Sequence, residues 1–193
     1  FLSRLRHPSG NQAGQQVDSQ GAEDKEPFAS LQQFARGQTA QLSYCGAQRY
    51  EIAADAYRKS IASGFSNKVW QAEAHHKLGQ SLFGLGQYEQ AKAEMVQSLA
   101  IRPNTPEILN NLGSVQLKLG DRAGALASFE KAVTLRPNYA IARFNLAEAL
   151  EPTNPKRALS EYETYLVLVE GIPEEADRIA LVQQRVKKLK PPK

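Results

Sequence analysis

The sequence has 193 residues, which is long enough for one domain with a hydrophobic core or for a short array of repeats with tails. Hydrophobic residues make up 41%, but no apolar run approaches the roughly 18 residues that a membrane-spanning helix needs, which excludes such a helix within these residues. The net charge of +4 is concentrated at the two ends, whereas a nucleic-acid-binding protein carries a basic stripe along one face of its folded part, so we expect no nucleic-acid partner.

Residues 1–27 indicate a flexible leader. From Pro8 to Pro27 the chain is rich in Gln, Gly, Ser and Asp and has almost no large apolar side chains, so burial cannot offset the entropy lost on ordering. Two interpretations of the first residues stay open. Arg4 and Arg6 either flank the exit of a membrane helix upstream of Phe1, which would tether the protein to a membrane, or lie in a disordered end.

Residues 28–67 predict a first pair of helices. Their apolar residues at helical spacing are Leu31, Phe34, Ala35 and Leu42 in the first helix and Tyr50, Ala53, Tyr57 and Ile61 in the second. Gly64 suits the end of the second helix, because glycine readily adopts the left-handed conformation found there. Ser66 or Asn67 can then cap the next helix.

From residue 72 to residue 139 the same pattern occurs twice at a spacing of 34 residues. Leu78-Gly79 recur as Leu112-Gly113, Gly86 as Gly120, Ala91 as Ala125, Met95 as Phe129, and Pro103-Asn104 as Pro137-Asn138. A third copy from Ala140 keeps the apolar spacing but has Ala147 in the glycine position and a turn that is one residue short. Tyr162 occupies the position of Phe129 in this copy.

This pattern resembles the tetratricopeptide repeat (TPR), a helix-turn-helix unit of 34 residues with small residues at fixed positions. The resemblance implies regular repeats over residues 68–105 and 106–139. It also implies a degenerate repeat over 140–172 and a degenerate first unit over 28–67, as terminal units of an array often are.

Residues 173–193 predict a capping helix followed by a frayed basic tail. One face of this helix is apolar, and it carries Ile179, Val182, Val186 and Leu189. Acidic residues at its start and lysines at its end complement the helix dipole. We therefore predict an all-α, right-handed superhelix of about four TPR helix-turn-helix units with a C-terminal capping helix that covers the last repeat.

In such a superhelix the first helix of each repeat lines the concave side. Positions two, six, nine and thirteen of each repeat share one helix face, because steps of three and four residues return to the same side. With neighbouring apolar positions included, the predicted partner-binding groove consists of Lys77, Gln80, Phe83, Asn111, Ser114, Leu117, Lys118, Phe144, Asn145 and Glu148.

Asn111 and Asn145 occupy the same position of successive repeats. In proteins that this chain resembles, asparagines at that position hydrogen-bond the backbone of an extended peptide; the alternative is that both stay solvated. Phe83, Leu117 and Phe144 either contact the partner or pack between repeats.

The chaperone-binding members of the family hold a C-terminal carboxylate with two asparagines and a Lys-Arg set. Here Lys77 stands where the first asparagine would be, Ile141 stands where a lysine would be, and no arginine completes the set. The pattern therefore favours a mid-chain peptide or a folded partner.

The sequence indicates no catalytic, cofactor or metal site. His75 and His76 are adjacent, so on a helix they point about 100 degrees apart and do not form the same-face pair of a metal site. Cys45 is the single cysteine, which excludes an internal disulfide, and no histidine is identifiable as a base for it. We expect no enzymatic activity, no cofactor and no bound metal.

The resemblance implies a non-catalytic adaptor that binds a peptide or a partner protein in the concave groove. By analogy with similar proteins, such an adaptor would be an assembly or scaffolding factor of a larger complex. If the tether upstream of Phe1 exists, that complex would be membrane-associated, and the protein would be membrane-tethered or periplasmic in bacteria; the sequence does not identify the compartment. The alternative is a permanent structural subunit that uses its convex or edge surfaces.

Overall fold

The structure is a computed structural model, and it describes residues 45–190 of the chain. Within these residues the elements in chain order are α3 (Cys45–Ser63), α4 (Lys68–Gly84), α5 (Tyr88–Ile101), α6 (Pro106–Lys118), α7 (Arg122–Leu135), α8 (Ala140–Leu150), α9 (Pro155–Leu168), the short 3-10 helix η1 (Pro173–Glu175) and α10 (Ala176–Leu189). The predicted first helix of the 28–67 pair lies outside the described residues, and α3 corresponds to its second helix.

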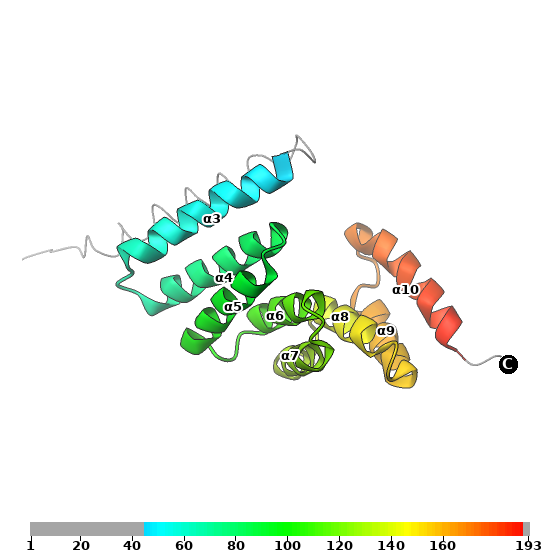
Figure 1. Cartoon of the computed structure of the whole chain (residues 1–193). Coiled ribbons are helices and arrows are strands. Elements are labelled where there is room, and N and C mark those ends of the chain that lie inside the picture. Colours follow the sequence, from blue (N-terminus) through cyan, green and yellow to red (C-terminus); the bar gives the residue numbers. More distant parts are fainter. Residues whose placement is uncertain (1–44, 191–193) are drawn as a thin grey trace, which may run out of the picture.

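The helices pack as successive antiparallel pairs. The pairs are α4 with α5, α6 with α7, and α8 with α9, and each pair also contacts the next one along the chain. Figure 1 shows the helices in one row, with α3 at one end and α10 at the other. No strand occurs in the described part of the chain. The predicted all-α TPR superhelix with a C-terminal capping helix is confirmed.

Turn glycines and caps separate the helices. Gly86 and Gly120 have φ angles of +74° and +79°, a left-handed conformation that glycine adopts without strain. Asn67 caps α4 and Asp121 caps α7, because each side chain accepts a hydrogen bond from a backbone N–H in the first turn. Thr105 occupies the N-cap position of α6, but its side chain makes no capping hydrogen bond, because its hydroxyl donates to the Arg102 carbonyl at 3.2 Å.

Each helix pair is closed by a large side chain on its second helix. Phe129 is fully buried, and a Cβ built on Gly113 would lie 2.6 Å from its ring, so only glycine leaves room for this ring. The equivalent contact in the preceding repeat joins Gly79 and Met95. Tyr162 fills the same position in the third pair and is also fully buried. The positions that the 34-residue period predicts for these large side chains are therefore core positions.

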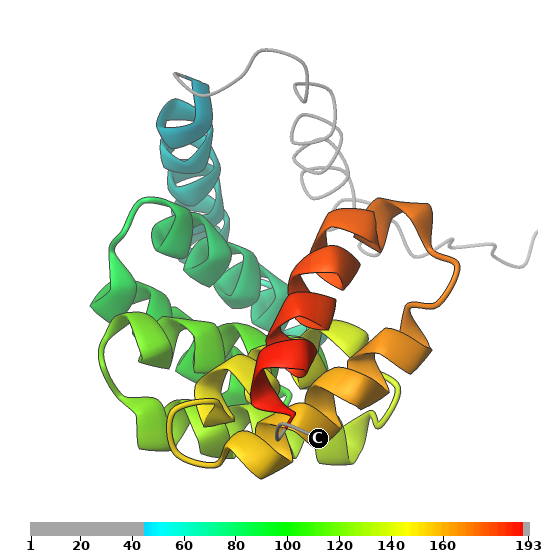
Figure 2. The ribbon, with the colours of Figure 1, turned by 90° about the vertical axis from the view of Figure 1, so that its right-hand side faces the viewer.

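The C-terminal helix α10 covers the last repeat. Val182 and Val186 are buried in a cluster with Tyr162 and Tyr165 of α9, and Ile179 packs against it. Two tyrosine hydroxyls also fix this helix. Tyr165 donates a hydrogen bond of 2.7 Å to Glu175, and Tyr162 accepts one of 2.8 Å from Arg185. In Figures 1 and 2, α3 and α10 stand at opposite ends of the row but on the same side of it.

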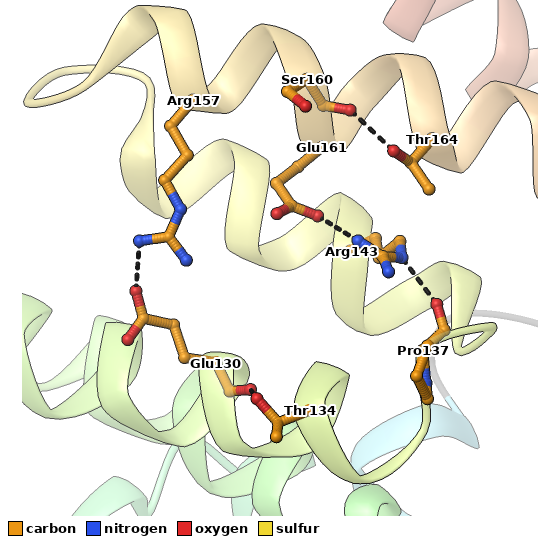
Figure 3. A network of polar contacts seen from close by, with 8 residues as sticks. All are labelled: Glu130, Thr134, Pro137, Arg143, Arg157, Ser160, Glu161 and Thr164. Carbon is orange, nitrogen blue, oxygen red and sulfur yellow. Dashed lines mark hydrogen bonds and ion pairs between the residues drawn. The ribbon is translucent and has the colours of Figure 1, made fainter.

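Polar contacts connect the two helices of the last repeat with each other and with the repeat before it (Figure 3). Arg143 of α8 donates to Glu161 of α9 at 2.6 Å and to the Pro137 carbonyl at 2.7 Å. Arg157 at the start of α9 pairs with Glu130 of α7, also at 2.6 Å. The pair between Arg143 and Glu161 thus joins the two helices of one repeat, and the pair between Arg157 and Glu130 joins that repeat to the one before it.

Among the described residues, no helix combines the length and the hydrophobicity needed to cross a bilayer. The predicted leader (residues 1–27) lies outside the described part of the chain, as do Arg4 and Arg6.

Candidate functional site

The first helices of the repeats form one surface of the array. Helix α4 contacts α6, and α6 contacts α8. These three helices therefore lie side by side, although each begins one full repeat after the one before it. All of the predicted groove residues belong to these three helices, and we call the surface that the helices form the concave face.

A pocket of about 420 Å³ opens on the concave face between α3, α4 and α6. Its lining residues are Tyr50, Gln80, Phe83, Met95, Asn111 and Ser114. Gln80, Phe83, Asn111 and Ser114 are four of the predicted groove residues, and the fold brings them together from two repeats. Tyr50 and Met95 were predicted only as packing residues.

The pocket combines an apolar interior with a polar rim. Met95 is buried at its base, and the Phe83 ring is held by the Tyr88 ring, with a centroid distance of 5.5 Å. Tyr50 of α3 is half exposed, and its ring lies over Gly84, where an added Cβ would come within 2.6 Å of it. Amide and hydroxyl groups from α4 and α6 complete the rim. This arrangement suits a bulky apolar side chain attached to a polar backbone.

Hydrogen bonds connect α4, α6 and α8 across the concave face. Asn145 Nδ2 donates to Asn110 Oδ1 at 2.8 Å, and Asn110 Nδ2 donates to Asn111 Oδ1 at 3.4 Å. Asn111 Nδ2 in turn contacts His76 Nε2 at 2.8 Å. We call these four residues the amide ladder. Asn111 and Asn145 are therefore neither simply solvated nor wholly available to a partner, because each uses part of its amide within the protein.

His76 is the buried end of the amide ladder, with 6% of its surface exposed. Burial lowers the pKa of its imidazole below the ordinary histidine value. The nearby carboxylates of Glu73 and Glu107 act in the opposite direction, whereas Lys77 and Arg102 lower the pKa further. A neutral imidazole is also what the ladder needs, since Nε2 must accept the Asn111 hydrogen bond.

Charged groups on the concave face are largely paired. Lys77 lies 3.6 Å from Glu73 on the same helix, and Arg136 forms an ion pair with Glu107. Burial alone would raise the pKa of Glu107, but a backbone hydrogen bond and Arg136 outweigh it and lower the pKa. Lys118 is exposed in the last turn of α6.

Helix α10 closes the C-terminal half of the predicted groove. Phe144 is only 8% exposed and lies between Tyr162 and Tyr165, with the Arg178 guanidinium 5.5 Å from its ring centroid. The prediction of Phe144 as a partner-contacting residue is therefore corrected to a core residue under the cap. The Phe144 side chain is buried because α10 covers the side of it that would otherwise face solvent.

Two further groove positions are engaged inside the protein. Glu148 is paired with Arg185 of α10 at 2.9 Å. Leu117 packs against the cluster around Phe129 and Leu146, which is packing between repeats. The open part of the concave face is therefore its N-terminal half, around the pocket.

Sequence reasoning missed Asn110, His76 and the two arginines of α10. A signal for the ladder exists in the sequence: His76 and Asn111, and likewise Asn110 and Asn145, are polar pairs separated by 35 residues, one more than the repeat length. Such a pair joins position five of one repeat to position six of the next.

Comparison with known proteins agrees with the architecture. Two family models described as tetratricopeptide repeat match residues 70–138 and 110–176, which together span more than half of the chain. Together with the packed helix pairs, these matches define the class of the protein, which is an all-α repeat superhelix. The chain belongs to the tetratricopeptide repeat family.

A relative among characterised proteins is the Hsp70-Hsp90 organizing protein of Triticum aestivum, which is 30% identical over 108 residues. The match covers 53% of this chain but only 19% of that protein, so the chain spans about one fifth of the relative's length.

Solved structures share the fold at low sequence identity. The Yersinia enterocolitica type III secretion chaperone SycD, in complex with a peptide of the translocator YopD, is 18% identical with a TM-score of 0.58, covering 61% of this chain and 90% of SycD. The second TPR domain of human RPAP3, in complex with an HSP70 peptide, is 20% identical with a TM-score of 0.56, covering 65% of this chain and all of that domain.

Proposed function

We propose that this protein is a non-catalytic adaptor that binds an extended segment of a partner protein on the N-terminal half of its concave face. The observation that carries this proposal is the convergence of Gln80, Phe83, Asn111 and Ser114 on one open pocket. We assign residues 28–67 to a degenerate first repeat, with α3 as its second helix and Tyr50 as its contribution to the pocket.

The chemistry of the pocket favours a particular mode of binding. Micromolar affinity corresponds to about 8 kcal/mol, and each neutral hydrogen bond contributes only about 1 kcal/mol net. Apolar burial must therefore supply much of the affinity, and the Phe83 and Met95 surfaces can accept a bulky apolar side chain. The amides of Gln80 and Asn111 then bond the backbone on either side of it.

A mid-chain segment fits better than a C-terminal carboxylate. Lys77 is the lysine nearest the pocket on α4, and it is already paired with Glu73. Arg136 is likewise paired with Glu107, so neither cation presents an unpaired charge to a carboxylate. The peptide complexes of SycD and RPAP3 support a peptide as the kind of ligand, although this chain departs from the Lys-Arg pattern of carboxylate binding.

By analogy with similar arrays, we infer that the adaptor assembles or holds together a larger complex, one associated with a membrane if a tether precedes Phe1. The rival is a permanent structural subunit that uses its convex or edge surfaces.

A selection from a random library of extended peptides on the immobilised protein, followed by titration of the selected peptide, tests the proposal. Ser114→Arg places a long side chain in the pocket and should weaken the affinity for the peptide by at least about tenfold. The matched change Ser160→Arg, on the exposed surface of α9, should leave this affinity unchanged. Circular dichroism checks that both variants are folded.

Equal affinities of the two variants, or failure of the selection to return any peptide, would contradict a binding site in the pocket. If Ser114→Arg also retains the natural partner on co-purification while Ser160→Arg loses it, the structural-subunit alternative gains support.

A further inference from the structure

The hydrogen bonds of the amide ladder all run in one direction. Asn145 donates to Asn110, Asn110 donates to Asn111, and Asn111 donates to His76. Rotating any one of these amides by itself would place two donors or two acceptors against each other. The three amides therefore have two consistent arrangements, the observed one and its complete reversal.

The imidazole at the end decides between the two arrangements. A His76 ring with a bare Nε2 accepts from Asn111 and holds the observed direction. A ring that is protonated on both nitrogens can only donate at Nε2, so it must face Asn111 Oδ1. The Asn111 amide then turns, and Asn110 and Asn145 must turn with it to avoid donor-donor contacts.

We propose that His76 is a positioning residue that sets which hydrogen-bonding atoms the asparagines of the concave face present to a partner, and that its protonation reverses them. The proposal rests on the proposed function, because it concerns the specificity of the same face. His76 is buried and acts only through Asn111, and the effect reaches α8 two helix pairs along the array.

The reversal exchanges the oxygen and the nitrogen of Asn111, which lines the pocket, and it changes what a partner that extends beyond the pocket meets at Asn145. In the observed arrangement Nδ2 of Asn145 is used by Asn110, and its Oδ1 is left to accept a hydrogen bond from outside. In the reversed arrangement Oδ1 is used and Nδ2 presents its donors. A partner that offers N–H groups is favoured at neutral pH, and one that offers carbonyl or carboxylate oxygens is favoured in acid.

The surroundings of His76 place the change at a pH below the ordinary histidine pKa. Burial lowers its pKa below the ordinary value of about 6.5. From α4 it is faced by Glu73 and Lys77, from α6 by Glu107, and from the end of α5 by Arg102, so two carboxylates raise the pKa and two cations lower it, with burial as the largest cause. As the pH falls, the His76 imidazole takes up its proton in the unfolded chain at a higher pH than it does in the folded protein. The free energy of unfolding therefore falls as the pH drops from about 6.5 through the folded-state pKa.

Nuclear magnetic resonance of the free protein tests the ladder without any ligand. The chain has three histidines, so the imidazole nitrogens are readily assigned. We expect His76 to carry its proton on Nδ1 at neutral pH. The side-chain amide signals of Asn110, Asn111 and Asn145 should all shift in acid with the midpoint of His76.

Two variants separate the ladder from general effects of acid. His76→Gln replaces the titrating group by an amide and should abolish the coordinated shifts. His75→Gln removes the neighbouring histidine, which contacts Glu94 at 2.7 Å outside the ladder, and should leave the shifts unchanged. A titration of His76 that leaves the Asn145 amide signals unmoved, or a proton on Nε2 at neutral pH, would overturn the proposal.

The peptide selected on the concave face tests whether the ladder affects binding. Its affinity should change by about fivefold across the His76 midpoint in the wild type, the equivalent of one neutral hydrogen bond, and should stay constant in His76→Gln. If the amide signals shift together but the affinity of the wild type for the peptide does not depend on pH, the ladder reverses without affecting specificity, and that part of the proposal is overturned. Because the amide shifts are measured without a peptide, failure of the peptide selection leaves the ladder test standing.

Discussion

Replacement of Gly113 by alanine should destabilise the protein, although alanine is the better helix former. The added Cβ would lie 2.6, 2.8 and 2.9 Å from three ring atoms of Phe129. This ring is fully buried, so it cannot move into solvent. Overpacking costs about 1 to 3 kcal/mol, and distances this short favour the upper end, while the gain in helix propensity returns about 1. The net loss should be about 2 kcal/mol.

The equivalent Gly79 provides the matched control. There the closest atom to the added Cβ is Cγ of Met95, at 2.9 Å, and a flexible unbranched side chain can shift, while the Ala91 carbonyl oxygen at 3.2 Å need give by only a few tenths of an ångström. Gly79→Ala should therefore change the free energy of unfolding by less than about 1 kcal/mol. In the Gly113→Ala background, Phe129→Leu should cost less than it does in the wild type, because the smaller side chain relieves the clash.

Urea denaturation followed by circular dichroism measures all of these variants. The reasoning would be refuted if Gly113→Ala were as stable as the wild type, or if Gly79→Ala were the more damaging of the two glycine changes. Additive effects in the double variant would likewise show that the clash with Phe129 is not the cause.

The remaining predictions concern polar contacts, titration and the first helix pair. Arg143→Ala should cost about 1 to 3 kcal/mol by urea denaturation, since its ion pair is only 16% and 14% exposed, whereas Arg157→Ala, with an exposed pair, should cost less than about 1 kcal/mol. Burial, the hydrogen bond to Glu175 and its charge raise the pKa of Tyr165 to about 12, so stability that is full below about pH 10 should fall as the pH rises toward 12; Tyr165→Phe should flatten this part of the pH profile in a denaturation series. Gly84→Ala would meet the ring of Tyr50 at 2.6 Å and should increase hydrogen exchange in α3, while an unchanged exchange rate would show that the ring moves without displacing the helix.

The fold could be predicted because its signals are local and repeat. Amphipathic spacing, a turn glycine and a small residue at a fixed position recur every 34 residues, and helix geometry alone then pairs Gly113 with the ring of Phe129. The degenerate third repeat followed the same logic, since Tyr162 takes the position of Phe129 and is fully buried there.

The candidate site could be predicted only in part. Spacing placed Gln80 and Asn111 on one surface, and they do line a common pocket. It did not reveal that Phe144 lies under α10, because the amphipathic pattern of a capping helix does not say how far it extends over the preceding helices.

By itself, the sequence determined the helices, their pairing and the capping end of this protein, because backbone hydrogen bonds and apolar periodicity act within one repeat. The tertiary structure alone decided which inner-face groups remain open to a partner. Asn111 meets His76, and Asn145 meets Asn110, only after the rotation from one repeat to the next brings side chains 35 residues apart within hydrogen-bonding distance. A hydrogen bond needs its two atoms within a few tenths of an ångström of the right separation, and no periodicity in the sequence specifies that placement.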